Sequence, residues 1–167
     1  GINTQTLADL PGKTEEEKQF INAGAVLRVT PIKDVKTMIQ AFAFAKKKVK
    51  NMKLWIMGPA DEDKKYAKEC YDLVKQMELQ NIIFTGRVDI QKYMEKLDFT
   101  ILTSISEGQP LSVLESMAAR RPCVCTDVGC CRELLEGKQG DPFGLAGYCV
   151  PPMYREGLAD AMEKMCL

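Results

Sequence analysis

The chain has 167 residues, of which 46% are apolar and 28% charged, and its 23 basic and 23 acidic residues leave no net charge. This composition is typical of one folded domain, and the zero balance gives no electrostatic reason to bind nucleic acid. The complete absence of histidine excludes a Ser-His-Asp triad, a Cys-His pair and a His-ligated metal within the chain.

The first 20 residues are polar and contain Pro11-Gly12 and the acidic run 15–17. We expect residues 1–20 to be a linker or lead-in segment and residues 21–167 to form the folded domain. Because the chain starts without Met and its last helix reads as cut short, we expect it to be a piece of a larger protein.

From Gly24 onward, short apolar runs alternate with segments of helical periodicity. The expected strands span residues 24–29, 54–57, 82–85, 99–102, 123–126 and 148–150. The expected helices span residues 35–49, 61–77, 90–97, 111–119, 131–136 and 158–167. Since no hairpin turns join the strands, crossover connections make them parallel and bury them on both sides. The sequence predicts an α/β fold: a single doubly wound Rossmann-like domain with a parallel sheet of about six strands and helices on both faces.

Two charged clusters flank the expected helices. The lysines at 46, 47, 48 and 50 suit the negative end of a helix dipole, although they could instead form a phosphate-binding patch. Asp61-Glu62-Asp63 looks like the D-x-D metal motif, but its position at the start of a helix favours an N-terminal capping cluster.

Seven cysteines, an odd number, are spread along the chain, several of them in apolar runs. We expect a reduced, cytoplasmic protein that uses cysteine as a small apolar side chain. The alternative is an all-thiolate zinc site, for which the spacing of a zinc ribbon is missing; its ligands would be Cys123, Cys125, Cys130 and Cys131.

Unusual residues follow the expected strands, at the edge where doubly wound sheets bind ligands. Gly58 and Gly86 follow the second and third strands, residues 104–110 the fourth, and residues 127–129 the fifth. Glycines let a ligand approach the backbone closely, although each also suits a plain turn. Together these residues predict a ligand cleft at this edge.

The segment after the fourth strand runs into a helix with Leu111 and Ser112 in its first turn. Free backbone amides at that helix start would make an anion site. Glu115 lies one turn further, where it could reach a ribose diol or simply complement the helix dipole. Arg28 and Lys33, separated by four residues, could both face one anion, as a departing diphosphate requires.

In combination, these segments resemble the nucleotide-binding domain of retaining glycosyltransferases of family 4, which have the GT-B fold. The resemblance covers residues 24–150 and rests on Arg28-x4-Lys33, Phe84-Thr-Gly86, Glu107-x7-Glu115, Pro122 and Asp127-Val-Gly129…Glu133. Residues 28–34, 58–63 and 102–107 look most like the subgroup of the Pel exopolysaccharide polymerase.

The resemblance implies a role for each matching residue. Arg28 and Lys33 would hold the donor diphosphate, and Glu107 would lie near the hydroxyls of the donor sugar; these three are the expected catalytic residues. Glu115 would bind the ribose. The other expected donor-binding residues are Gly86, Arg87 and Val88 around the base, and Gly108, Gln109, Leu111 and Ser112 near sugar and phosphate. The implied donor is a UDP-sugar such as UDP-glucose, with no metal and no other cofactor.

Four positions depart from the family pattern, because Gln109 and Pro110 replace Phe-Gly of the usual Glu-Gly-Phe-Gly. Pro110 lacks a backbone N–H, which leaves open which amides hold the phosphate. Arg120 and Cys130 stand where the family has glycine.

The resemblance implies one half of a two-domain enzyme, so we expect the acceptor-binding domain to lie N-terminal to this chain in the larger protein. This chain would be the donor-binding half of a transferase that acts on a polysaccharide or other glycan; alone it would bind nucleotide weakly and transfer nothing. Two other functions stay open. One is a catalytically silent nucleotide-binding or scaffold module that docks on a membrane polysaccharide-synthesis complex. The other is a sugar-phosphate epimerase, for which only Glu107 and Asp127 offer acid–base groups.

Overall fold

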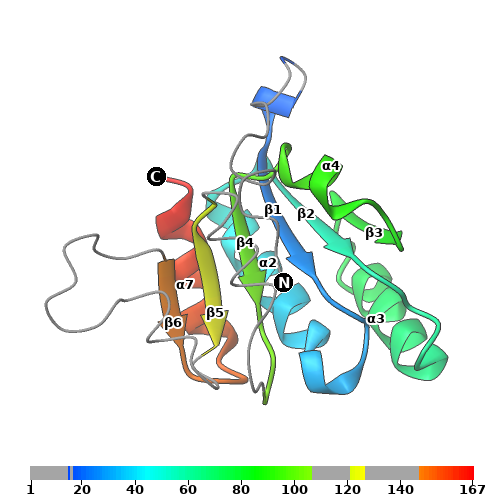
Figure 1. The fold of residues 1–167 in the computed structure, drawn as a ribbon. Coiled ribbons are helices and arrows are strands. Elements are labelled where there is room, and N and C mark those ends of the chain that lie inside the picture. The colour runs from blue at the N-terminus through cyan, green and yellow to red at the C-terminus, as the bar shows by residue number, and fades with distance from the viewer. Residues whose placement is uncertain (1–14, 16, 107–120, 127–146) are drawn as a thin grey trace, which may run out of the picture.

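A six-stranded sheet organises the chain (Figure 1). The computed structural model describes residues 15, 17–106, 121–126 and 147–167. The strand order is β3-β2-β1-β4-β5-β6, and every pair of neighbouring strands is parallel. The strands are β1 Ile21–Val26, β2 Met52–Met57, β3 Ile82–Gly86, β4 Phe99–Leu102, β5 Cys123–Thr126 and β6 Gly147–Val150.

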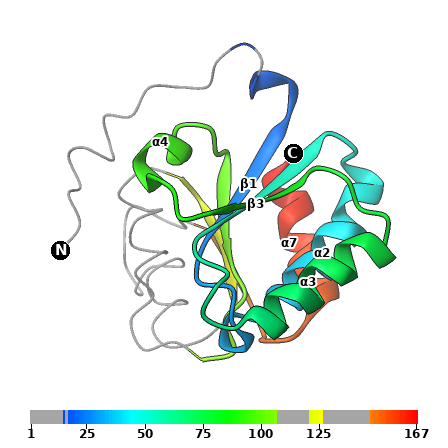
Figure 2. The ribbon, with the colours of Figure 1, turned by 90° about the vertical axis from the view of Figure 1, so that its right-hand side faces the viewer.

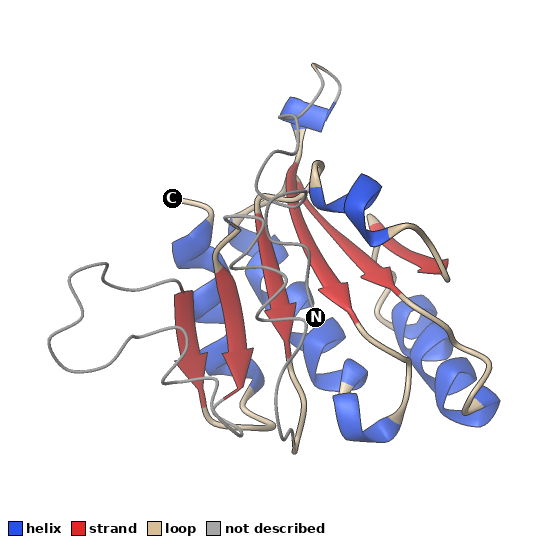
Figure 3. Cartoon of the chain, in the orientation of Figure 1, coloured by secondary structure: helices blue, strands red, loops and turns tan. Residues whose placement is uncertain are grey.

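Helices cover both faces of the sheet, as Figures 2 and 3 show. Three long helices lie on one face: α2 Val35–Lys48, α3 Lys64–Gln76 and α7 Arg155–Met165. The short helix α4, Ile90–Met94, lies on the other face, and two 3-10 turns complete the described elements, η1 Glu17–Gln19 and η2 Pro31–Lys33. The predicted fold class, a Rossmann-like parallel sheet with helices, is confirmed. The helices expected at 111–119 and 131–136 lie outside the described residues.

Each face of the sheet has its own apolar core. On the face of the three long helices, Phe42 of α2 and Leu158 of α7 are fully buried against strand residues such as Ile56. On the opposite face, Met94 of α4 packs with Met57 of β2. The strands therefore carry apolar side chains toward both layers, which explains why they read as continuous apolar runs in the sequence.

The first strand begins three residues earlier than predicted and ends at Val26 instead of 29. Asn22 is polar, so the apolar run that predicted the strand begins only after it. Its side chain is buried, and its Oδ1 accepts a 3.0 Å hydrogen bond from Trp55 Nε1. Helix α4 also ends three residues sooner than the expected 97, and the last helix spans 155–165 instead of 158–167.

The lysines at the end of α2 have local partners. The Nζ of Lys46 donates to the carbonyl of Met52 at 3.2 Å, and Lys48 lies 3.5 Å from Glu163 of α7. They precede the amino end of β2, so they lie at the edge of the sheet opposite the strand ends where the ligand was expected. This geometry agrees with lysines that interact with the negative end of the dipole of α2, and not with a phosphate-binding patch at the candidate site. None of the described helices is long and apolar enough to cross a bilayer.

The cysteine of α3, Cys70, should make the free energy of unfolding depend on pH. Burial raises the pKa of the Cys70 thiol to about 11, from an ordinary value of 9.0. A raised pKa means that the folded state holds the proton more tightly, so the stability that Cys70 contributes is complete below about pH 9 and is lost as the pH rises through about 11. We expect that loss to be on the order of 2 kcal/mol.

Urea unfolding of the reduced protein between pH 8 and pH 11 measures this loss. The Cys70→Ala variant should start less stable at pH 8 and lose less of its remaining stability as the pH rises. Parallel stability profiles for the variant and the parent chain would show that the thiol of Cys70 does not titrate as stated.

Candidate functional site

The strand order reverses between β1 and β4, and this pair marks the candidate site. In open parallel sheets, ligands bind outside the carboxyl ends of the strands at such a reversal. Arg28 lies two residues beyond the end of β1, and Lys33 lies in the turn η2 that follows. Residues 103–106 follow β4 at the same edge. The topology therefore places both predicted cations at the point where a doubly wound fold binds its ligand.

Hydrogen bonds connect the ends of four neighbouring strands. The amide of Leu27 donates to Met57 O at 3.0 Å, and the amide of Gly58 donates to Gly86 O at 2.9 Å. On the other side, the amide of Ile105 donates to Ile32 O at 2.9 Å. The edge formed by β3, β2, β1 and β4 is thus one continuous backbone surface.

Thr103 fixes the turn that carries Lys33. Its hydroxyl is 2.7 Å from the carbonyl of Lys33 and 3.0 Å from that of Asp34, and the residue is fully buried. Asp34 has a left-handed backbone, with φ of 50°, and its Oδ1 accepts from the amide of Thr37 at the start of α2. Thr103 carried no local signal of this role, because in the sequence it looks like an ordinary residue at a strand end.

Within the part of the chain that the structure describes, two buried polar atoms at this edge have no hydrogen-bond partner, Oδ2 of Asp34 and Oγ of Ser104. Ser104 follows Thr103 directly, and its carbonyl accepts a 2.6 Å hydrogen bond from the hydroxyl of Thr126 in β5. The backbone of this segment is therefore held firmly, while polar side-chain atoms beside it keep unused bonding capacity.

Replacing Thr103 tests how firmly the turn is held. Thr103→Val keeps the shape but removes the hydroxyl, which leaves two buried carbonyls without this donor. We expect a loss of about 1–3 kcal/mol in the free energy of unfolding. Urea unfolding measures it, with Thr103→Ser as the matched control because serine retains the hydroxyl. Equal stability of Thr103→Val and the parent chain would show that the hydroxyl of Thr103 does not hold this turn.

Carboxylates from the segment after β2 approach the cations at this edge. Nη1 of Arg28 lies 3.3 Å from Oε2 of Glu62, and Nη2 of Arg87 lies 3.9 Å from Oδ1 of Asp61. All four side chains are more than half exposed, so each ion pair contributes at most about 1 kcal/mol. A multiply charged anion can therefore compete with these carboxylates for the guanidinium groups.

The capping role predicted for the acidic cluster at 61–63 is confirmed for one of its three residues. Only Asp63 caps α3, by accepting a 2.9 Å hydrogen bond from the amide of Tyr66. Asp61 and Glu62 face the arginines instead, a pairing that depends on the sheet order and has no local signal in the sequence. Among the residues that the structure describes, no group of three His, Cys, Asp or Glu side chains could hold a metal ion.

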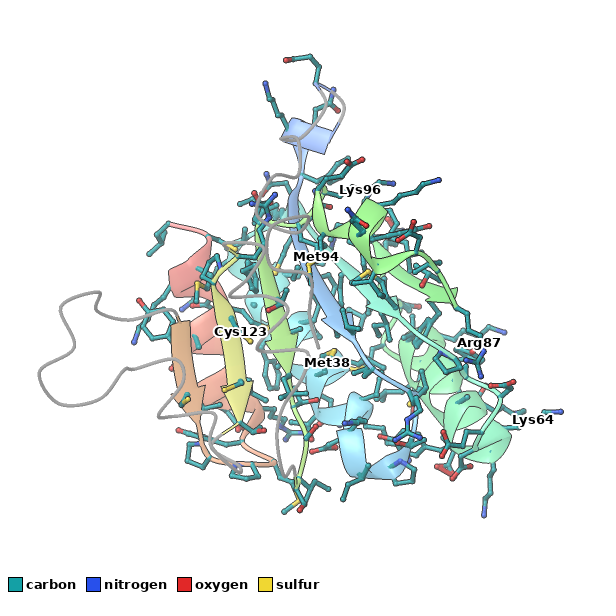
Figure 4. The ribbon with its side chains drawn as sticks, viewed as in Figure 1. Met38, Lys64, Arg87, Met94, Lys96 and Cys123 are labelled. Carbon is teal, nitrogen blue, oxygen red and sulfur yellow. The ribbon has the colours of Figure 1, made fainter. Side chains whose placement is uncertain are left out.

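The residues around the end of β3 occupy two environments. Gly86 ends the strand with φ of 69°, and Figure 4 shows Arg87 directly beyond it at the carboxyl edge. Val88 is partly buried and packs on the apolar cluster of Met57 and Met94. Gly86 and Arg87 therefore border the candidate site, while Val88 also contributes to the core beneath α4.

The structure brings together only part of the predicted site. Arg28, Lys33, Gly86 and Arg87 lie along one edge of the sheet. Val88 follows Arg87 and packs on the core, and the other predicted site residues lie outside the described part of the chain; they are Glu107, Gly108, Gln109, Leu111, Ser112 and Glu115.

Solved structures share this architecture. Anabaena Alr3699/HepE, crystallised with UDP and glucose, matches 99% of this chain with a TM-score of 0.81 at 21% identity; the match covers 45% of that chain. The C-terminal domain of the glycosyl transferase group 1 protein LpcC from Francisella tularensis matches 99% of this chain with a TM-score of 0.79 at 24% identity, covering 88% of that domain. At these identities the likeness shows the fold.

Curated relatives match at the level of sequence. The poly(ribitol-phosphate) alpha-N-acetylglucosaminyltransferase of Staphylococcus aureus is 32% identical over 106 residues, which are 63% of this chain and 21% of that protein. The N-acetyl-alpha-D-glucosaminyl L-malate synthase of Bacillus anthracis is 30% identical over 151 residues, 89% of this chain and 36% of that enzyme. The chain thus spans about a fifth to a third of these two relatives. Because residues 17–166 match the family described as glycosyl transferases group 1, the chain belongs to that family.

Proposed function

We propose that this chain is the donor-binding domain of a retaining glycosyltransferase of family 4, and that it binds a UDP-sugar such as UDP-glucose. The observation that carries the proposal is the placement of Arg28 and Lys33 at the reversal of strand order between β1 and β4. The structurally similar protein HepE was crystallised in complex with UDP and glucose, which supports the choice of donor.

In the proposed reaction, the bond between C1 of the sugar and the diphosphate oxygen breaks, and UDP leaves with the electron pair. Arg28 and Lys33 stabilise the negative charge that develops on that oxygen. The acceptor hydroxyl attacks C1 on the same face and gives its proton to the departing diphosphate oxygen, so the configuration at C1 is retained. Since two fixed cations supply the positive charge, the reaction needs no metal.

The remaining donor contacts follow the family pattern. We assign Glu107 to the sugar hydroxyls and Glu115 to the ribose, while Gly86, Arg87 and Val88 hold the base. The loop and helix start at Gly108, Gln109, Leu111 and Ser112 would contact sugar and phosphate.

The acceptor side belongs to a second domain in the proposed full-length protein. Residues 21–167 would form the donor domain, with residues 1–20 leading in from the acceptor-binding domain. The full protein would add sugar to a polysaccharide or other glycan on the cytoplasmic side of a membrane complex. Within the family, we assign it to the subgroup of the Pel exopolysaccharide polymerase. This chain alone should bind donor and transfer nothing.

Isothermal titration of the chain with UDP, GDP, ADP and UDP-glucose tests the proposal. We expect UDP and UDP-glucose to bind more tightly than the other two nucleotides, because the proposed site beside Gly86 contacts the base and selects uracil. Equal affinity for all three diphosphates would refute the uridine assignment, and no binding of any of them at millimolar concentration would refute the donor site itself.

A further inference from the structure

Two cysteine thiols face each other across neighbouring strands. Cys125 of β5 and Cys149 of β6 are register partners in the parallel ladder, and their sulfur atoms lie 3.4 Å apart, at hydrogen-bonding distance and without a disulfide between them. Neighbouring strands run about 4.8 Å apart, within the range that a disulfide spans between Cα atoms. A small rotation of the side chains would bring the two sulfurs to bonding distance.

The pair lies on the face of the sheet opposite α7. Val124 of β5 packs in the core that contains Leu158 of α7, and Lys164 of α7 lies 5.6 Å from the ring centre of Tyr148 in β6. Because side chains alternate along a strand, Cys125 and Cys149 project to the other face.

The two thiols differ in exposure. Cys125 is fully buried, whereas Cys149 is partly exposed on β6, the edge strand of the sheet. Figure 1 shows β5 and β6 side by side at this edge. A small oxidant therefore reacts first with the thiol of Cys149, and the buried thiol of Cys125 lies close enough to react with the product.

We propose that Cys125 and Cys149 form an intramolecular disulfide when the chain meets hydrogen peroxide. The Cys149 sulfur attacks one peroxide oxygen, which breaks the O–O bond, releases water and leaves a sulfenic acid. The Cys125 sulfur then attacks the Cys149 sulfur, forms the S–S bond and expels a second water. In balance, two thiols are oxidised, one peroxide is reduced, and two water molecules are formed.

The bond would tie the edge strand β6 to β5 and close the stretch of chain between them. Cys125 and Cys149 are 24 positions apart, and cross-linking a loop of that length restricts the unfolded chain. We expect the melting temperature of the oxidised protein to exceed that of the reduced protein by about 5–10 °C. This inference does not depend on the proposed donor or reaction.

Peptide mapping tests the proposal on the full chain. The reduced protein is treated with one equivalent of hydrogen peroxide, unfolded in N-ethylmaleimide to block remaining thiols, and digested without reductant. We expect the main product to be a peptide pair joined through Cys125 and Cys149, in a protein lighter by two hydrogen atoms. A first disulfide between other cysteines, or single-site oxidation of Cys149 without a bond to Cys125, would overturn the proposal.

Two variants sharpen the result. Cys149→Ser should abolish the linked peptide and the rise in melting temperature. Cys166→Ser, which removes another partly exposed thiol at the end of α7, should leave both unchanged. A rise in melting temperature that persists in Cys149→Ser would refute the assignment even if that variant is itself less stable.

Discussion

Replacing Gly58 with alanine is expected to destabilise the protein by about 3–5 kcal/mol. Gly58 has φ of 145°, and a Cβ at this position would lie 1.7 Å from the backbone oxygen of Leu27. That oxygen belongs to the segment leaving β1, so the strand ends would have to separate. The hydrogen bond from the amide of Gly58 to Gly86 O would be strained as well. The free energy of unfolding, measured in urea, gives the size of the effect.

Gly86→Ala is the matched control for this prediction. Gly86 also has positive φ, 69°, but a Cβ there would meet no atom within 4 Å. Only the conformational cost remains, about 1–2 kcal/mol. If both variants lose the same stability, the close approach of Gly58 to β1 is not what requires glycine.

The double variant Arg28→Ala/Lys33→Ala is expected to lose at least about 100-fold in affinity for UDP-glucose. Hydrogen bonds to charged groups contribute about 1.5–3 kcal/mol each, and two lost contacts to one diphosphate add to more than the 2.7 kcal/mol that corresponds to that factor. Isothermal titration of the parent chain and the variant measures the ratio. The loss should be smaller for uridine, which has no phosphate.

A second double variant controls for total charge. Lys47→Ala/Lys50→Ala also removes two cations, but both flank the carboxyl end of α2, at the opposite edge of the sheet. It should bind UDP-glucose as the parent chain does. Equal binding by the parent chain and Arg28→Ala/Lys33→Ala would refute the proposed diphosphate contacts and favour a catalytically silent module.

Much of the fold could be predicted because its strands are solid apolar runs bounded by turn residues. The strands at 99–102 and 123–126 coincide with β4 and β5, since buried parallel strands leave no ambiguity of pattern. The range predicted for the first strand began and ended three residues too late, because the start of this strand depends on tertiary contacts. The amide of Asn22 donates to Asp98 Oδ2 at 2.7 Å, across 76 positions of sequence, and a local pattern cannot contain such a bond.

The candidate site, like the fold, combines features with a local sequence signal and contacts that depend on the tertiary structure. Glycines at strand ends and cations in the loop after β1 carry local signals, and the structure places them at one edge. The pairing of Arg28 with Glu62 and the bond from Thr103 to Lys33 arise only when the sheet order is known. The edge of the sheet could therefore be predicted from the sequence, whereas the contacts that position its charged groups could not.

The central claim is that a nucleotide-diphosphate sugar binds where β1 and β4 end. The most direct measurement is an NMR titration of the isotope-labelled chain with UDP-glucose, following backbone amides. We predict that, among the described residues, the largest shifts occur at 27–34, 58–60, 86–88 and 103–106. Shifts concentrated at the other edge of the sheet, around residues 46–51 and 95–98, would contradict the account.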